Sequence, residues 1–313
     1  MPDLPRAREA LLAPQGSGFL RAMRLGMLAI IVATVLVWLT PGRADAQGAW
    51  TPQCDVHERA FAGAGLANAV SVYTLEWAPF GPAEWGWVTY VPLLQKEIGT
   101  DCQPGSPDFA EALSRFQARY GLTATGVFDR ATFEVLKGVL QERRPFIMAR
   151  LRDECPSPPP LRLLGYLVEE EEHADRLTRL LRRDVLDAYR RMVAAARAEV
   201  PEINADRELL QIFSGFRDPE ADAARCAAQG NCDGLRRAVC SAHRTGTAVD
   251  LYVGQLFDMG VDNTNADSRR HMSQGATYRW LVKNAGRFGF VPYLYEPWHW
   301  EWVAPGGDTL ISE

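Results

Sequence analysis

The chain has 313 residues, of which 47% are hydrophobic, 23% charged and 10% aromatic. This length suits two domains, and the composition excludes a disordered chain, a collagen-like repeat and a coiled coil. The formal net charge is −5. A nucleic-acid-binding protein with a strongly basic face is therefore not expected.

The first 46 residues have the pattern of a signal peptide. An uncharged run, residues 25–39, follows Arg21 and Arg24, and an Ala-Asp-Ala cleavage pattern ends at Ala46. As a helix the run spans about 22 Å, which is short of the roughly 30 Å bilayer core. We therefore predict a secretory signal peptide that is cleaved after Ala46. The protein is expected to be exported, either periplasmic or associated with the cell wall, and to contact the membrane only through this segment. An uncleaved anchor is the alternative. Without residues 1–46 the net charge becomes −7.

Six cysteines follow the predicted cleavage point, at positions 54, 102, 155, 226, 232 and 240. An even number in an exported chain favours disulfides, and the lack of a C-x-x-C pair argues against a cysteine zinc site. Six cysteines permit fifteen pairings. Cys226 and Cys232 could close a short loop, which would leave Cys240 to pair with the N-terminal part; the sequence does not decide the pairing.

The proline-rich stretch 155–160 (CPSPPP) is the clearest internal break, because consecutive prolines favour a stiff extended spacer. We place the domain boundary in this linker, between an N-terminal region, residues 47–154, and a C-terminal domain, residues 161–313. The acidic run 169–172 is interpreted as a solvated helix face.

Helical patterns in the N-terminal region predict a small three-helix module with its core at residues 87–140. One helix is expected at 91–98, and a second carries apolar residues from Phe109 to Tyr120 and ends at Gly121. Asp129 can cap the third, whose apolar face extends to Leu140. Three tryptophans precede or begin this core, and local packing is expected of them, with stacking on sugars as the alternative; they are Trp77, Trp85 and Trp87.

Several short segments of this module follow one another in a recognisable order: Leu93-Leu94-Gln95, Phe116-Gln117, Tyr120-Gly121-Leu122, Gly126-Val127-Phe128 and Thr132. This order resembles the peptidoglycan-binding-domain-1 family of cell-wall-binding modules. The resemblance implies that the peptidoglycan polymer is a partner. A helical spacer domain is the alternative interpretation.

The C-terminal domain shows both helical and strand patterns. Apolar residues from Leu177 to Val200 trace one face of a long helix that ends before Pro201. Strands are expected at 209–213, 248–253 and 298–303, and a further helix at 278–287 closes near Gly289. This mixture predicts an α+β fold.

Two segments of this domain carry chemistry, SAHRTGTAVD at 241–250 and YEPWHWEW at 295–302. They supply His243, Asp250 and His299, and two imidazoles with a carboxylate form an open coordination set for catalytic zinc. The chain has five histidines. The other three are expected at the surface: His57, His173 and His271.

The residues around His299 alternate as a strand, which places the tryptophans at 298, 300 and 302 on one side and His299 on the other. Glu296 precedes a proline and is expected outside a helix, close to the metal. A carboxylate beside the metal can take a proton from water and deliver it to a leaving amine. Glu301 shares the face of His299 and is the alternative candidate for this role.

S-x-H-x-x-G-x-A-x-D followed by E-P-W-H-W resembles the VanY-type zinc D-alanyl-D-alanine carboxypeptidases, and residues 214–217 (SGFR) resemble a third motif of that family. The resemblance covers about residues 180–303. It implies a small antiparallel-sheet domain shared with hedgehog-like proteins. It also implies one Zn²⁺ per chain, bound by His243, Asp250 and His299.

The same resemblance implies roles for three further residues: Glu296 as general base and acid, Arg217 as the cation that stabilises the oxyanion, and Ser241 as a contact for the substrate terminus. The chain departs from the family at Asp222, where many members have Gln, and at Glu301, where Arg is frequent. These departures leave the predicted ligands and base intact.

The predicted function is zinc-dependent D-alanyl-D-alanine carboxypeptidase activity, which trims terminal D-Ala from peptidoglycan stem peptides. An endopeptidase that cuts stem or cross-bridge peptides is the alternative, because motifs define the metal and the base but not the pocket shape. A non-catalytic wall-binding protein is a remote alternative, since the predicted ligands and base are all present.

Overall fold

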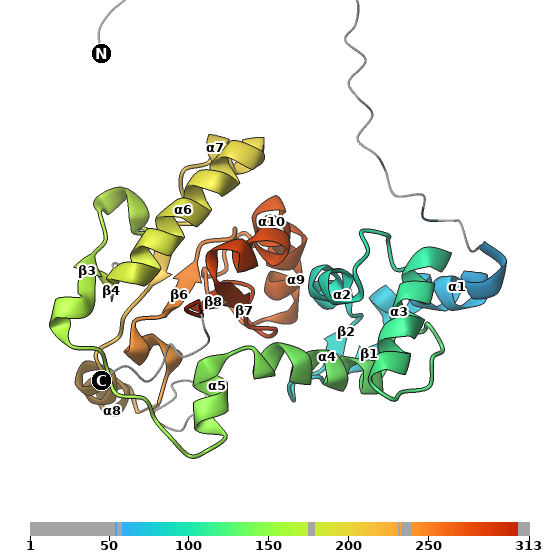
Figure 1. The fold of residues 1–313 in the computed structure, drawn as a ribbon, viewed down its shortest axis with the longest axis horizontal. Coiled ribbons are helices and arrows are strands. Elements are labelled where there is room, and N and C mark those ends of the chain that lie inside the picture. Colours follow the sequence, from blue (N-terminus) through green and yellow to red (C-terminus); the bar gives the residue numbers. More distant parts are fainter. Residues whose placement is uncertain (1–53, 55–57, 175–178, 231, 233–239, 306–313) are drawn as a thin grey trace, which may run out of the picture. The chain divides into compact units, whose positions relative to one another are not determined.

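A computed structural model describes residues 54, 58–174, 179–230, 232 and 240–305 (Figure 1). The predicted signal peptide and His57 lie outside these residues. No helix in the part of the chain described here is long and apolar enough to cross a bilayer. The described residues all belong to one compact unit, and one cluster of buried apolar side chains extends through both regions. The domain boundary at 155–160 stays a prediction.

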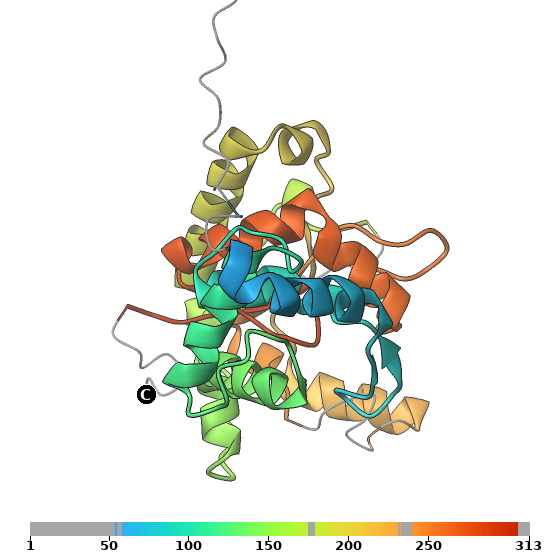
Figure 2. The same ribbon diagram turned by 90° about the vertical axis from the view of Figure 1, so that its right-hand side faces the viewer.

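The N-terminal region consists of helices and one short hairpin. Its elements are α1 (Glu58–Thr74), β1 (Glu76–Trp77), β2 (Glu84–Trp85), the 3₁₀ helix η1 (Val88–Tyr90), α2 (Val91–Ile98), α3 (Pro107–Arg119), α4 (Arg130–Glu142) and α5 (Pro145–Arg150). Ser106 and Asp129 cap α3 and α4 through their side-chain oxygens. The three predicted helices are therefore present as α2, α3 and α4. Three is an undercount, however, because α1 packs against α3 (Figure 2).

The three tryptophans of this region differ in environment. Trp77 and Trp87 are buried, and their indole N–H groups donate to Gly86 O at 2.8 Å and to Ser71 Oγ at 3.2 Å. The prediction of local packing is confirmed for these two residues. It is wrong for Trp85, which is 61% exposed.

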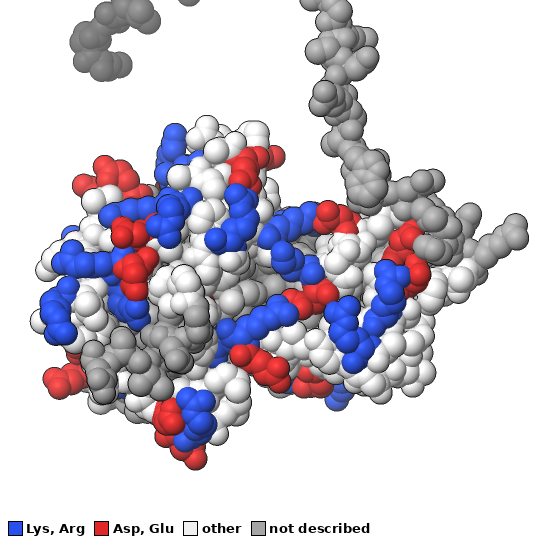
Figure 3. Space-filling view, viewed as in Figure 1, with Lys and Arg blue, Asp and Glu red and all other residues white. Residues whose placement is uncertain are grey.

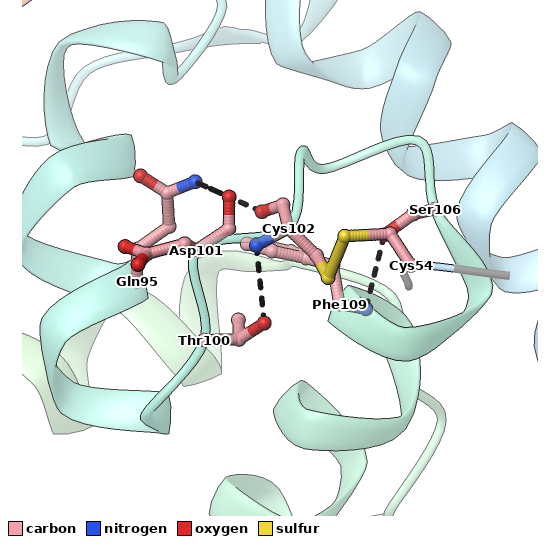
Figure 4. The surroundings of a disulfide bond; sticks show 7 residues. All are labelled: Cys54, Gln95, Thr100, Asp101, Cys102, Ser106 and Phe109. Carbon is pink, nitrogen blue, oxygen red and sulfur yellow. Dashed lines mark hydrogen bonds between the residues drawn. A yellow bond between two sulfur atoms is a disulfide. The ribbon is translucent and has the colours of Figure 1, made fainter. Parts of the chain in front are cut away.

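A disulfide between Cys54 and Cys102 joins the segment before α1 to the loop after α2 (Figure 4). That loop is also held by Thr100 Oγ1, which accepts the N–H of Cys102 at 3.1 Å, and by Gln95 Nε2, which donates to Cys102 O at 2.8 Å. The disulfide therefore fixes the start of the described chain against a loop that is already ordered by hydrogen bonds.

The C-terminal region combines helices with two small antiparallel sheets. Its elements are η2 (Leu161–Leu163), β3 (Leu164–Tyr166), η3 (Glu169–Glu171), β4 (Leu180–Arg182), α6 (Arg183–Glu199), α7 (Pro201–Ala205), β5 (Ile212–Ser214), α8 (Pro219–Gln229), η4 (Ala242–Thr245), β6 (Ala248–Leu251), α9 (Ala266–Gln274), α10 (Ala276–Asn284), η5 (Ala285–Phe288), β7 (Phe290–Pro292) and β8 (His299–Trp302). Strands β3 and β4 pair, and the larger sheet has the order β5-β6-β8-β7. In Figure 1 α6 lies on one side of this sheet and α8 on the other. The predicted mixture of helices and small antiparallel sheet is confirmed.

Two element boundaries differ from the prediction. The helix expected from Leu177 begins at Arg183, because Leu180–Arg182 pair with Leu164–Tyr166 as a strand. The strand expected at 209–213 begins at Ile212, because Leu210 has a positive φ of 72° that interrupts extended backbone.

The prediction that His173 lies at the surface is wrong. Its backbone N–H donates to Ile212 O at 3.0 Å, and its ring lies 4.4 Å from that of Tyr252. Both His173 and the neighbouring Glu172 are buried. The acidic run is therefore not entirely a solvated helix face, whereas His271 is exposed as predicted.

The remaining four cysteines form two further disulfides. Cys226 pairs with Cys232, which confirms the predicted short loop. Cys240 pairs with Cys155. The partner of Cys240 is thus the first residue of the proline-rich linker, and not a residue of the N-terminal region.

Candidate active site

The larger sheet brings Asp250 and His299 together. These residues are register partners on the antiparallel strands β6 and β8, so their side chains project from the same face. His243 enters from η4, which is joined to β6 by a turn at Gly246 with a positive φ of 66°. Two segments of the chain, with Asp250 and His299 49 positions apart, therefore meet at one point on the sheet.

The donor set fits a zinc ion. One ligand atom from each of His243, Asp250 and His299 lies within 4.8 Å of the other two, and all three residues are buried. Asp250 Oδ2 is 3.2 Å from His243 Nε2, and Asp250 Oδ1 is 2.8 Å from His299 Nδ1. Two imidazole nitrogens and a carboxylate oxygen form the ligand set that zinc prefers at catalytic centres with an open position.

The outward nitrogens of both histidines face acceptors. His243 Nδ1 lies 2.8 Å from Gly215 O, and His299 Nε2 lies 3.2 Å from Glu301 Oε1. Each acceptor favours a proton on the nitrogen that it faces, which leaves the inward nitrogen available as a ligand. The surrounding residues therefore orient both rings for metal binding.

The charges of the site support the same interpretation. Burial and the Arg217 guanidinium lower the pKa of His243. Burial opposes ionisation of Asp250, but the two histidines outweigh it and hold the Asp250 pKa well below its usual range. Burial also opposes protonation of His299, yet its hydrogen bonds to Asp250 and Glu301 raise the pKa of this imidazole to about 9. A bound metal would displace that proton.

Glu296 lies on the turn that leads into β8. The backbone N–H of His299 donates to Glu296 O at 3.0 Å, which ties the turn to the cluster. Glu296 and the cluster line one cavity of about 610 Å³. Burial and the Asp250 charge raise the pKa of Glu296, although His299 and two arginines partly oppose this shift. A carboxylate with a raised pKa beside three candidate metal ligands is suited to taking up and releasing a proton.

Arg217 and Ser241 line the same cavity. Arg217 Nη2 donates to Ser241 Oγ at 2.9 Å, and Arg217 Nε lies 3.7 Å from Asp222 Oδ2. Ser241 also caps η4 by accepting the N–H of His243. The two predicted residues are thus joined to one another and to the cluster, and the carboxylate at position 222 faces the guanidinium.

Glu301 is the second carboxylate close to His299. It is 2% exposed, and its Oε1 accepts from Arg144 Nε at 2.9 Å and Arg144 Nη2 at 2.6 Å. The Arg144 guanidinium also stacks on the ring of Tyr293, 4.0 Å from the ring centroid. These contacts favour a positioning role for Glu301, as the group that holds His299, over a role as the base.

Sequence reasoning missed Arg144. It is the residue before α5 and comes from the N-terminal region, 157 positions away from Glu301. No local pattern indicates a partner at that distance. The sequence signal that was available is Glu301 itself, an acidic residue on the same strand face as His299.

A second arginine links the two regions beside the site. Arg269 is 1% exposed, and it donates to Glu84 Oε1 at 2.6 Å and to Tyr90 Oη at 2.7 Å. Its Nε donates to the carbonyl of Tyr295 at 2.7 Å. Because Tyr295 precedes Glu296, the N-terminal region also supports the turn that carries this carboxylate.

Comparisons with known proteins agree with these observations. Residues 178–305 match the family model of VanY, D-alanyl-D-alanine carboxypeptidase, and residues 104–136 match that of PG_binding_1, a peptidoglycan binding domain. No curated protein matches the chain. Four solved chains match. One similar structure is that of the LdcB LD-carboxypeptidase, with 21% identity over 46% of this chain and 69% of that chain and a TM-score of 0.31.

Proposed function

We propose that this chain, whose residues 178–305 match the family model of VanY, D-alanyl-D-alanine carboxypeptidase, is a zinc-dependent peptidase that removes the terminal D-alanine from peptidoglycan stem peptides. One observation carries the proposal. His243, Asp250 and His299 form a buried ligand cluster that shares a cavity with Glu296, and all four residues lie inside the matched segment.

The N-terminal region supports peptidoglycan as the partner and a location outside the cytoplasm, because residues 104–136 match a peptidoglycan binding domain. Holding the enzyme on its polymer raises the effective concentration of the stem peptides. On the face drawn in Figure 3, basic and acidic side chains are interspersed. We therefore attribute wall binding to local contacts and not to net charge.

In this proposal His243, Asp250 and His299 would hold one zinc ion. When bound, the ion would act as a Lewis acid that polarises a carbonyl and lowers the pKa of water. Glu296 accepts the proton of the attacking water on a carboxylate oxygen and then delivers it to the nitrogen of the leaving D-alanine. The raised pKa of Glu296 suits both steps, since the same group acts first as base and then as acid.

Arg217 stabilises the negative charge that develops on the oxygen of the scissile amide. Its Nη2 is held by Ser241, and its guanidinium lines the cavity. In this role the arginine neutralises charge at the reacting carbonyl while Ser241 contacts the substrate terminus.

The position of cleavage is tested by incubating the zinc-loaded protein with a pentapeptide stem and with intact cross-linked peptidoglycan, followed by mass analysis. Loss of one alanine from the pentapeptide is the expected result. Cleavage only within cross-links would show an endopeptidase instead.

The roles within the site are tested by two substitutions. Glu296→Gln should keep about one zinc per chain and lower turnover by roughly 10²- to 10⁴-fold, because the amide cannot accept a proton. His299→Ala should lose the metal. Near-normal turnover of Glu296→Gln would show that Glu296 is not the general base, and Glu301 would then be the candidate for this role.

A further inference from the structure

A second cavity adjoins the catalytic one. It has a volume of about 640 Å³ and lies between the β1–β2 hairpin of the N-terminal region and the segment that begins α9. Thr264 and Tyr295 line both cavities. The two cavities are therefore neighbours that share part of their lining, and we call the second one the Trp85 cavity.

The Trp85 cavity has an exposed indole held on a rigid support. The register of the hairpin places Trp77 and Glu84 inward and Glu76 and Trp85 outward. Glu84 is fixed by its ion pair with Arg269 at 2.6 Å. On the other side, Gly86 has a φ of 73°, and a Cβ there would lie 2.3 Å from Val72 O, so the backbone is pressed against α1. The indole is thus presented from a fixed backbone.

The charged groups around this cavity are already paired. Glu84 is bound to Arg269, and Arg270 is bound to Asp267. What remains for a ligand is chiefly the indole, Thr89 and Thr264, and two amides. The Asn263 and Asn265 side-chain oxygens accept the backbone N–H groups of Asn265 and Asp267, both at 2.9 Å, so their NH₂ groups are left to donate. Such a lining favours an uncharged, hydroxyl-rich ligand over the charged groups of a peptide.

We propose that the Trp85 cavity binds a saccharide unit of the peptidoglycan glycan strand, next to the stem peptide in the catalytic cavity. The C–H face of a sugar ring packs on the electron-rich face of the Trp85 indole. The two asparagine amides donate to sugar hydroxyl or N-acetyl oxygens. This inference rests on the proposed function, because it assumes that the stem peptide occupies the neighbouring cavity.

The test compares two substrates with the same pentapeptide, one free and one attached to its disaccharide, on the full zinc-loaded protein. Wild type should show a higher kcat/KM on the disaccharide-linked substrate. Trp85→Ala should lower kcat/KM on that substrate by about tenfold and leave the free pentapeptide unchanged. Trp85→Phe should keep most of the preference. Tyr73→Ala is the matched control, since Tyr73 is also an exposed aromatic residue of this region but lies outside residues 104–136 and does not line the cavity.

Three results would overturn the assignment: equal kcat/KM of wild type on the two substrates, a Trp85→Ala variant that keeps the preference, or the same loss in Tyr73→Ala. Binding of the peptide-free disaccharide, followed by tryptophan fluorescence, separates this inference from the proposed function. If the protein fails to cleave the free pentapeptide, the carboxypeptidase proposal is refuted. Disaccharide binding that is lost in Trp85→Ala would still support saccharide binding in the Trp85 cavity. If wild type does not bind the disaccharide, the proposal that the Trp85 cavity binds a saccharide is refuted.

Discussion

Substitution of Arg144 by alanine tests whether the N-terminal region supports the metal site. Two N–H groups of this arginine donate to the same oxygen of Glu301, and both side chains are buried. Without the guanidinium, the Glu301 carboxylate would keep His299 Nε2 as a partner and lose its ion pair. We therefore expect both folding stability and metal affinity to fall.

The size of the effect follows from the charge of Glu301. Burial opposes its ionisation, but Arg144 and His299 together lower the Glu301 pKa from 4.5 to about 2. Because His299 contributes part of this shift, the cost of removing Arg144 is better taken from other buried ion pairs, which lose about 3–5 kcal/mol when one member is removed. Arg144→Ala should therefore lower the free energy of unfolding by about 3 kcal/mol at pH 7. Zinc affinity should fall by roughly 10- to 100-fold, as when the orienting partner of a metal ligand is removed.

The free energy of unfolding is measured by urea denaturation, and zinc affinity by competition with a chromophoric chelator. Arg143→Ala is a matched control, because Arg143 is exposed and pairs with Glu97 inside the N-terminal region. Arg144→Lys should give an intermediate zinc affinity, since it keeps the charge without the two-pronged contact. If Arg144→Ala matches Arg143→Ala in both measurements, Arg144 does not support His299.

Three further predictions follow from the site and the disulfides. Because a base acts only when ionised and the pKa of Glu296 is raised, kcat/KM should rise with pH through a midpoint above 4.5, and a midpoint at or below 4.5 would contradict this role. Cys155 and Cys240 are 85 positions apart, and replacing both by serine should lower the free energy of unfolding by about 4.5 kcal/mol. Cys226 and Cys232 are 6 positions apart, and the same replacement there should cost about 2 kcal/mol. Equal losses of the two variants in urea denaturation would refute the loop-entropy argument. Removing zinc with a chelator should abolish turnover, and about one equivalent should restore it, whereas a fully active metal-free protein would end the zinc proposal.

That His243, Asp250 and His299 lie close together follows largely from local patterns. The alternation around His299 defines the strand β8. The antiparallel register of β8 with β6 then places Asp250 opposite His299. The helices α3 and α4 were predictable for a similar reason, since their caps, Ser106 and Asp129, and their apolar faces lie within the same short segments.

The features that sequence patterns did not predict depend on distant partners. Helix α1 has apolar residues on its exposed side, Leu66, Val70 and Tyr73, as well as buried ones, so no single apolar face marks it. The residues 180–182 continue a helical pattern but form a strand because β3 is available to pair with them. Arg144 and Arg269 were not identified because their carboxylate partners lie in the other region of the chain.

The disulfide between Cys155 and Cys240 affects what happens if the proline-rich linker is cut. Most residues of the stretch 156–160 are exposed, and Cys155 lies on its N-terminal side. A protease that cleaves within this stretch separates the polypeptide into two pieces that the disulfide still joins. In an oxidising compartment the nicked protein therefore keeps its N-terminal region attached to its C-terminal region, and the two fragments separate on a denaturing gel only after reduction.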